Sequence, residues 1–417
     1  MARAKIITGL DIGTNSIKVL VAEKRGNEWN VLSYSSIPSF GLRKGSVTNL
    51  EETSRNIQTL IAGAERDIGR RINSAYVNMG GSHLYVTPSD GLISVSRADH
   101  IISQEDIDRV LQATRAINIS RNEEILDVFP KEFIIDDQKG VKHPLGLSGV
   151  RLQAKVLLLC YFQQNFVNLT QAVLSAKLQI DDIIPSPLAA AESVLTREQK
   201  EAGVALIDIG ASTTSLAVFE EGDLVHLAVF PLGSGNVTHD LAIGLKTEIA
   251  TAEDIKKQYG SCILSEKGEK DLPAGRQEKR GQSSKLKLSI ASHPVSFTKK
   301  NLVDIIEPRV SEIFDLMQKE LKKIGRQELL PAGVVLTGGG AKLSRIKDLA
   351  KERLKLPCRI GYPKDIIGLQ EDPSLATVAG LVMSSPDFYE EGSSSMSFEF
   401  MKGWSSKFRR MFRVFIP

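Results

Sequence analysis

The sequence predicts two similar α/β domains with a binding cleft between them. The main observation is an internal repeat, because residues 10–14 (LDIGT) and residues 207–211 (IDIGA) follow the same pattern. In both places an apolar run ends in aspartate and glycine, and a second run rich in β-forming residues follows. Segments with the apolar spacing of helices lie between the two repeats. Such a repeat indicates a duplicated domain, and a duplicated domain offers a cleft between its halves.

The composition is that of a folded chain with several domains. A chain of 417 residues is too long for one compact domain, and 42% hydrophobic with 25% charged residues is ordinary for globular proteins. The formal net charge of +3 argues against a surface that binds nucleic acid. The three cysteines, Cys160, Cys262 and Cys358, lack metal-binding spacing and are expected to be reduced cytosolic thiols.

The sequence has no apolar run near the roughly 20 residues that a membrane-spanning helix needs. Its first residues also lack the apolar core of a secretory signal. Any contact with a membrane is therefore expected to be peripheral.

Each repeat is expected to form a two-stranded hairpin whose turn can hold phosphate. The expected strands are residues 6–12, 17–22, 204–209 and 215–219, with turns at residues 13–16 and 210–214. Glycine and small residues let a phosphate approach the backbone N–H groups of such turns. One turn alone is more simply an ordinary connection, but two facing turns would clamp a polyphosphate, with Asp11 and Asp208 holding Mg²⁺ through water. The residues expected to contact the nucleotide here are Gly13, Thr14, Asn15, Lys18, Gly210, Ala211, Ser212 and Thr213.

Two further glycine-rich segments are expected to complete the nucleotide site. A strand at residues 334–337 runs into Gly338, Gly339 and Gly340 before a helix from Leu343, and these glycines leave room for a base or ribose. Residues 233–240, with Gly235 and Asn236, form a turn that Thr238 is expected to cap as a helix begins. Glu253 and Lys256 share one helical face and suit the edges of ribose and adenine. The alternative for the three glycines is a plain strand-to-helix turn. The alternative for Glu253 and Lys256 is a solvated ion pair on a helix surface.

Residues 83–164 do not fit the pattern of the repeats and are expected to form an inserted α+β module. Strands are expected at residues 84–95, 125–133 and 150–159, around a helix at residues 104–117. Ser103 is the expected N-cap of that helix, with Asp106 completing a capping box. A second helix is expected at residues 50–69, before the insert, and the polar, basic stretch at residues 266–287 is expected to be a surface loop.

Taken in order, these segments resemble the phosphate-1, connect-1, phosphate-2 and adenosine motifs of the actin, Hsp70 and sugar-kinase superfamily. The connect-1 counterpart is residues 184–192. Within that superfamily the chain is similar to the FtsA family of bacterial cell-division proteins over nearly its whole length. The similarity includes residues 124–130 and 144–152 of the insert, which look like the extra subdomain of FtsA called 1C. It extends to residues 359–363 and 375–381.

The resemblance implies duplicated actin-like (ribonuclease H-like) domains around a nucleotide cleft, with a 1C-type insert and a C-terminal amphipathic helix. The implied divisions are subdomain 1A at residues 1–82, 165–198 and 358–383, 1C at 83–164, 2A at 199–226 and 301–357, 2B at 227–300, a linker at 384–399 and the helix at 400–417. The family further implies ATP and Mg²⁺ as ligands and self-association into filaments. It also implies the tail of FtsZ as a partner docking on subdomain 2B.

Some residues depart from the family pattern, and these departures bear on catalysis. Ala211 and Ser212 replace two glycines of the usual phosphate-2 turn, and Ser215 stands where an aspartate is common. Ser186 lacks the carboxylate that Hsp70-like relatives have in connect-1. We therefore expect ATP binding with weak or no ATPase activity, and the residues name no catalytic base.

Residues 400–417 have the pattern of a helix that lies on a membrane surface. At about 100° per residue, the large apolar side chains fall within an arc of roughly 120°. Basic residues occupy the other side, where Val414 is the one apolar residue among them. The segment has no carboxylate after Glu399. The residues expected to enter the membrane are Trp404, Phe408, Met411, Phe412 and Phe415, and those expected to meet anionic headgroups are Lys407, Arg409, Arg410 and Arg413.

Alternatives for this helix and for the whole chain remain open at this point. The helix can instead pack on the protein's own core or fill a groove of a partner protein. The preceding linker and the uniformly basic face favour the membrane. The leading interpretation of the chain is an ATP-binding adaptor that attaches the FtsZ ring to the inner face of the cytoplasmic membrane at the division site. The alternatives are a PilM-like pilus-assembly protein and a sugar-kinase-like enzyme, which would need a catalytic base and no lipid-binding tail.

Replacing Phe408 or Trp404 with glutamate is expected to weaken binding to anionic vesicles at least about tenfold. Burying a large apolar side chain contributes about 1.5–3 kcal/mol, and about 1.4 kcal/mol corresponds to tenfold. Liposome co-sedimentation measures the loss. Ser406→Glu is the control, since it adds the same charge directly opposite the centre of the apolar arc, and it should have a smaller effect. Unchanged binding of both test variants would rule out this membrane contact.

Overall fold

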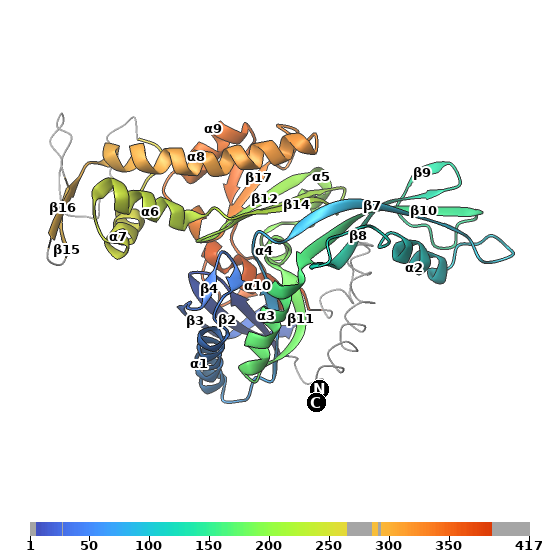
Figure 1. The fold of residues 1–417 in the computed structure, drawn as a ribbon, viewed down its shortest axis with the longest axis horizontal. Helices are drawn as coiled ribbons and strands as arrows, with labels where there is room; N and C mark the ends of the chain where they lie inside the picture. Colours follow the sequence, from blue (N-terminus) through green and yellow to red (C-terminus); the bar gives the residue numbers. More distant parts are fainter. Residues whose placement is uncertain (1–5, 27, 265–285, 291–292, 386–417) are drawn as a thin grey trace.

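The computed structural model describes residues 6–26, 28–264, 286–290 and 293–385. The expected amphipathic helix at residues 400–417 lies outside these residues, as do most of the basic stretch at 266–287 and nearly all of the linker at 384–399. Figure 1 shows the first domain below, the second domain above it and the insert extending to the right. Within the described part of the chain, no helix has the length and apolar character needed to cross a membrane.

The first domain is built on a six-stranded sheet with the order β11-β6-β1-β2-β3-β19. Its strands are β1 (Ile6–Ile12), β2 (Ser16–Arg25), β3 (Glu28–Pro38), β6 (Ser74–Met79), β11 (Gln179–Pro185) and β19 (Ile366–Ile367), and β4 (Leu42–Arg43) pairs with β5 (Ser46–Val47) beside them. Helices α1 (Leu50–Ile68) and α3 (Gln163–Ser175) cover one face. Helices α4 (Ser186–Val194) and α10 (Ala376–Met383) cover the other, so the sheet is buried on both sides.

The second domain and the insert share one nine-stranded sheet, with the order β18-β17-β12-β13-β14-β7-β10-β8-β9. The second domain supplies β12 (Val204–Ile209), β13 (Thr214–Glu220), β14 (Asp223–Phe230), β17 (Val334–Thr337) and β18 (Cys358–Ile360). The insert supplies β7 (Tyr85–Ser94), β8 (Glu123–Ile135), β9 (Gln138–Val141) and β10 (Arg151–Phe162), with α2 (Gln104–Ala113) packed on them. A single bridge between Tyr85 and Ala228 joins the two parts.

The remaining elements surround the second domain. They are α5 (Arg197–Ala202), α6 (Ser234–Leu245), α7 (Ile249–Tyr259), β15 (Leu286–Ile290), β16 (His293–Phe297), α8 (Lys299–Lys323), α9 (Ile346–Leu354) and the short 3₁₀ helices η1 (Gly339–Lys342) and η2 (Pro373–Leu375). Helices α6 and α7 and the β15–β16 hairpin form a smaller unit, on the left in Figure 1, under one end of the long helix α8.

The two domains have the same topology around their repeats, which confirms the predicted duplication. Strand β1 pairs antiparallel with β2 and parallel with β6, and β12 pairs antiparallel with β13 and parallel with β17. The strands predicted at residues 6–12, 204–209 and 334–337 have those bounds. The capping box of Ser103 and Asp106 is present, but the helix that it opens ends at Ala113 rather than near residue 117.

Two predicted helix starts were wrong. Helix α6 begins at Ser234, so Thr238 lies inside the helix and does not cap it. The N–H of Gly233 is satisfied by Oδ1 of Asn236 at 3.0 Å, and the Thr238 hydroxyl instead contacts Glu253 of α7. The helix predicted from Leu343 is also displaced, because η1 precedes it and α9 begins only at Ile346.

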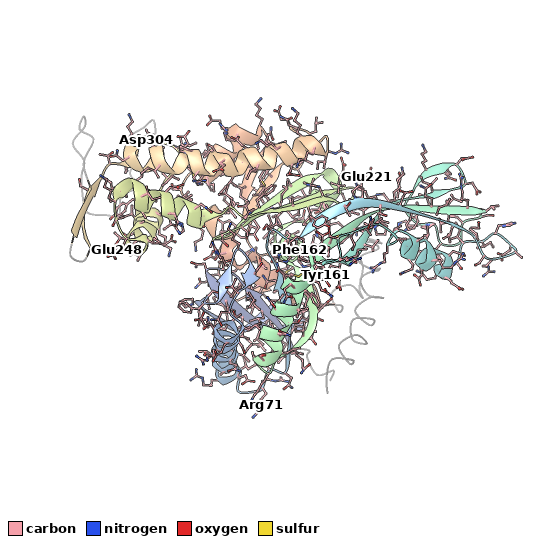
Figure 2. All side chains as sticks on the ribbon, in the orientation of Figure 1. Arg71, Tyr161, Phe162, Glu221, Glu248 and Asp304 are labelled. Carbon is pink, nitrogen blue, oxygen red and sulfur yellow. The ribbon has the colours of Figure 1, made fainter. Side chains whose placement is uncertain are left out.

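Side-chain contacts tie the insert to both domains. Figure 2 marks Tyr161 and Phe162 where β10 ends and the chain returns to the first domain, and Glu221 between β13 and β14. The Lys142 ammonium of the insert lies 2.6 Å from Oδ2 of Asp223 and 3.3 Å from Oε2 of Glu221. Buried Phe129 of the insert belongs to the same hydrophobic cluster as strands of both domains. The insert is therefore packed on the second domain while its chain ends lie in the first.

Helix α10 is held between α4 and strand β1 by glycines. A Cβ at Gly380 would lie 1.7 Å from the carbonyl oxygen of Ala189 in α4. A Cβ at Gly9 would lie 2.9 Å from the carbonyl oxygen of Val378. Both distances are far below van der Waals contact, so the close packing of these elements requires glycine at both positions.

Gly380→Ala is expected to lower the free energy of unfolding by about 2–3 kcal/mol or more, because α10 must move away from α4 to admit the methyl group. Urea denaturation followed by circular dichroism measures the change. Gly63→Ala in α1 is the matched control, since no atom lies within 4 Å of its added Cβ. That variant should gain roughly 0.5–1 kcal/mol from reduced backbone entropy. Equal stability of the two variants would contradict the packing argument.

Candidate functional site

A cavity of about 660 Å³ lies between the two domains, with both hairpin turns in its wall. Most of the residues that the sequence predicts for the site line this cavity. They are Asp11, Gly13, Thr14, Asn15, Lys18, Asp208, Gly210, Ala211, Thr213, Gly235, Glu253, Lys256, Gly338, Gly339 and Gly340. Ser212 and Asn236 lie outside the wall, where each makes a hydrogen bond within the protein. The fold thus brings segments far apart in sequence to one place.

The two hairpin turns have the same local geometry. Gly13 donates its N–H to the carbonyl oxygen of Ser16 at 3.2 Å, and Gly210 donates to that of Thr213 at 2.8 Å. A Cβ at Gly13 or Gly210 would lie about 3 Å from the same carbonyl oxygen. Each turn therefore needs glycine at its first position for its own closure, and both turns line the cavity.

Asp11 and Asp208 end the first strand of each repeat, and their environments differ. Asp11 accepts hydrogen bonds from the Lys18 ammonium at 2.8 Å and from Nδ2 of Asn78 at 2.9 Å. Burial opposes the charge of Lys18, but the Asp11 carboxylate outweighs it, and the pKa of Lys18 is raised. Burial, and then the charge of Asp11, raise the pKa of Asp208 to about 6. The site therefore holds two nearby carboxylates and one compensating cation.

The donor set fits a magnesium ion that keeps most of its ligands outside the protein. In the part of the chain that the structure describes, no group of three or more His, Cys, Asp and Glu side chains could hold a metal. Asp11 and Asp208 supply only two carboxylates to the wall. Mg²⁺ is commonly bound by one or two carboxylates together with water and phosphate oxygens. A site of this kind depends on a phosphate ligand.

Three helices begin at the cavity wall. Ser186 opens α4, Ser234 opens α6, and Thr377 lies in the first turn of α10. The N-terminus of a helix carries partial positive charge, which attracts anions. In α6 this charge acts without free N–H groups at the first two positions, because Ser234 and Gly235 already donate to carbonyl oxygens of the turn between β12 and β13. Together with the two glycine turns, these helix ends make the cavity suited to a polyphosphate.

Asn78 is a site residue that the sequence interpretation missed. Its Oδ1 accepts a hydrogen bond from the N–H of Ile12 at 2.6 Å, and its Nδ2 donates to Asp11 and to the Ser186 hydroxyl. It thereby links β6, β1 and α4 beneath the first turn. The signal was available, because Asn78 is the one amide side chain near the end of an otherwise apolar strand, shortly before Gly80 and Gly81, which also line the cavity.

Glu253 and Lys256 do not form the solvated ion pair that was the alternative for them. Lys256 is 9% exposed, and its ammonium donates to the Ser234 carbonyl oxygen at 3.1 Å and to the Thr238 hydroxyl at 2.7 Å. It also lies 2.6 Å from Oε2 of Glu253. Burial lowers the pKa of Lys256 in spite of the Glu253 charge. Since these contacts use the three ammonium hydrogens, Lys256 positions Glu253 and has none left for a ligand.

The three glycines after β17 have separate reasons to be glycine. A Cβ at Gly338, whose φ is +83°, would lie 2.2 Å from Oδ1 of Asp208. A Cβ at Gly340 would lie 2.3 Å from Cγ2 of Ile209, whereas one at Gly339 would meet no atom closer than 4.0 Å. Two of the glycines are thus required by the end of β12. Only at Gly339 would an added Cβ have open space, and all three glycines line the cavity where a base or ribose is expected.

The fold and the site together define a protein of the actin-like class. Among solved structures, PilM of the PilM–PilN type IV pilus biogenesis complex aligns with a TM-score of 0.65 at 18% identity, covering 90% of this chain and 97% of that one. MreB5 of Spiroplasma citri bound to ADP aligns with a TM-score of 0.52 at 14% identity, covering 95% and 98%. These similarities show the fold alone.

Sequence similarity identifies the family. The profile of cell division protein FtsA matches residues 205–380, and that of the SHS2 domain inserted in FtsA matches residues 81–160. Cell division protein FtsA of Pseudomonas aeruginosa is 37% identical over 94% of this chain and 91% of its own length. FtsA of Bacillus subtilis is 34% identical over 92% and 84%, and that of Escherichia coli is 32% identical over 94% and 93%. The chain belongs to the FtsA family of cell division proteins.

Asp208→Asn is expected to stabilise the ligand-free protein by about 1–3 kcal/mol at pH 7.5. The raised pKa of about 6 means that the folded protein favours the protonated carboxyl, so ionisation above that pH costs stability. This cost disappears as the pH falls below roughly 4, where Asp208 is protonated in both states. Urea denaturation in EDTA measures the free energy of unfolding of the variant and of the unaltered protein at pH 7.5 and at pH 4.

Asp11→Asn is the matched contrast to that variant. It removes the charge that pairs with the buried Lys18 ammonium, and it should destabilise the protein at pH 7.5. At pH 7.5 Asp208→Asn is therefore expected to raise the free energy of unfolding, and Asp11→Asn is expected to lower it. A loss of stability for Asp208→Asn at pH 7.5 would contradict the electrostatic account of the site.

Proposed function

We propose that this chain is an ATP-binding, actin-like cell-division protein that polymerises and tethers the FtsZ ring to the inner face of the cytoplasmic membrane. The observation that carries the proposal is the cavity between two equivalent phosphate turns, with Asp11 and Asp208 in its wall. Membership of the FtsA family supports the role in cell division and sets aside the pilus-assembly and sugar-kinase alternatives.

The nucleotide is ATP, with its phosphates between the two turns. Asp11 and Asp208 would hold Mg²⁺ through water, and the ion would offset the phosphate charge beside the N-termini of the helices at the cavity wall. Glu253, oriented by Lys256 and Thr238, presents a carboxylate to a ribose hydroxyl. Solved MreB5 structures of the same fold are described as bound to ADP and to AMPPNP, which supports an adenine nucleotide.

ATP acts mainly as an assembly signal, with slow hydrolysis or none. Of the described residues that line the cavity, only Asp11, Asp208 and Glu253 carry carboxylates. The first two are committed to the cation side and Glu253 is held by Lys256. Ser186 and Ser215, where relatives have carboxylates, offer only hydroxyl groups. A general base must accept a proton near the reacting phosphate, and none of these groups is suited to do so.

The partner surfaces lie away from the cleft. The FtsZ tail docks on the unit around α6 and α7, within residues 227–300, where Ile243 and Ile249 are exposed apolar side chains. The membrane contact is made by the helix at residues 400–417, which lies outside the described residues. One such helix binds weakly, so a filament that presents many copies gains avidity and holds the ring at the membrane.

Electron microscopy on an anionic lipid monolayer tests the whole proposal. Full-length protein with Mg²⁺ and ATP is expected to form filaments on the lipid and to recruit added FtsZ. A truncation after Ser397 should leave the monolayer bare, because it lacks the helix. Absence of filaments with every nucleotide would overturn the assembly role. A failure of lipid-bound filaments to recruit FtsZ would overturn the tethering role.

Two glycine variants separate the ATP site from the rest of the protein in that experiment. Gly338→Ala places its methyl 2.2 Å from Oδ1 of Asp208, so it should weaken Mg²⁺-ATP binding at least about tenfold and remove the ATP-dependent filaments. Gly325→Ala has the same change at a similar φ of +67°, with no atom within 4 Å of its Cβ. It adds a methyl group at a positive φ without any contact to Asp208, and it should form filaments like the unaltered protein.

A further inference from the structure

The tips of the two phosphate turns touch each other directly. The Ser212 hydroxyl, in the turn between β12 and β13, donates a hydrogen bond to Oγ1 of Thr14, in the turn between β1 and β2, at 2.8 Å. The two residues are 198 positions apart and belong to different domains. The bond therefore spans the cleft at the end where the turns meet.

Both partners of this bond are fixed to their own domain. Oγ1 of Thr14 also accepts from the N–H of Gly45 at 3.1 Å, in the small β4–β5 hairpin. The turn around Ser212 is anchored on α6, because the N–H groups of Ser234 and Gly235 donate to the carbonyl oxygens of Gly210 and Ala211 at 2.9 and 2.7 Å. Any movement that separates the two turns must break the bond between Ser212 and Thr14.

Ser212 differs from its neighbours in its relation to the cavity. Thr14, Ala211 and Thr213 line the wall, whereas Ser212 does not. Its hydroxyl is directed to the opposite turn. Position 212 is also one of the two at which this turn departs from the glycine-rich family pattern, and a glycine there could make no such bond.

We propose that Ser212 and Thr14 form a latch that closes the phosphate end of the cleft and slows both entry and exit of nucleotide. The latch rests on the proposed ATP binding. Ser212 is then a positioning residue and not a ligand of the nucleotide, which corrects the contact expected for it from the sequence. The latch stabilises the closed cleft whether or not nucleotide is inside. Its loss therefore raises the association and release rate constants together.

Stopped-flow fluorescence with N-methylanthraniloyl-ATP and Mg²⁺ on the full chain measures both rate constants. Ser212→Ala is expected to raise each by a similar factor of about 2 to 10, the usual net contribution of one hydrogen bond. In a Thr14→Val background, where the accepting oxygen is already missing, Ser212→Ala should add nothing. A rise in release alone would show that Ser212 contacts the nucleotide, and it would overturn the latch. An equal effect of Ser212→Ala in both backgrounds would overturn it too.

A cross-link tests the latch without relying on nucleotide affinity. The two hydroxyl oxygens lie 2.8 Å apart, so Thr14→Cys with Ser212→Cys puts two thiols at facing positions across the cleft, where a disulfide would join them at about 2 Å. The disulfide is expected to form in ligand-free protein and to block nucleotide exchange until a reductant is added, with each single cysteine variant as control. No disulfide, or unchanged exchange in the oxidised protein, overturns the latch. Failure of the unaltered protein to bind nucleotide overturns the proposed function instead.

Discussion

The contact between α10 and α4 is the packing constraint on which the site depends. The missing side chain of Gly380 lets α10 lie directly on the backbone of Ala189, and Gly9 lets β1 approach α10 from the other side. The N-terminal ends of these two helices then reach the cavity, where Ser186 bonds to Asn78 and Thr377 bonds to Asp208. Both aspartates of the site are therefore held through the same packed layer. A small displacement of α10 would therefore change the positions of both Asp11 and Asp208.

The electrostatics of the cleft show a site organised for its ligand at some cost to the ligand-free protein. Asp11 is satisfied by Lys18 and Asn78, whereas Asp208 is buried close to a like charge and has a raised pKa. A divalent cation between the two would remove that repulsion. Helix N-termini and glycine turns around it offer positive potential to an anion. The cleft is thus expected to bind a cation and a polyphosphate together more tightly than it binds either ligand alone.

The insert gives the molecule a second connection between its domains. Its chain enters from β6 and leaves into α3 of the first domain, but its strands continue the sheet of the second through Tyr85 and Ala228. Lys142 adds ion pairs to Asp223 and Glu221, and Phe129 packs among strands of both domains. The hydrogen bond between Ser212 and Thr14 and the contacts of the insert therefore both link the two domains.

The features that depend on neighbouring residues could be predicted from the amino-acid sequence. Apolar runs ending in Asp-Ile-Gly predicted the paired strands, Ser103 with Asp106 predicted a helix start, and the repeat predicted the duplicated topology. Most residues expected at the cleft line it, because glycine turns at strand ends are local signals. The contacts between residues far apart in the chain became visible only in the folded protein. In the folded protein Thr238 bonds to Glu253 and does not cap a helix, and Asn78 donates a hydrogen bond to Asp11. Gly338 must be glycine because a side chain there would collide with Asp208. The fold also joins the insert to the far domain and sets Ser212 against Thr14. These contacts link positions far apart in the chain, and no local periodicity or propensity encodes which of them will meet.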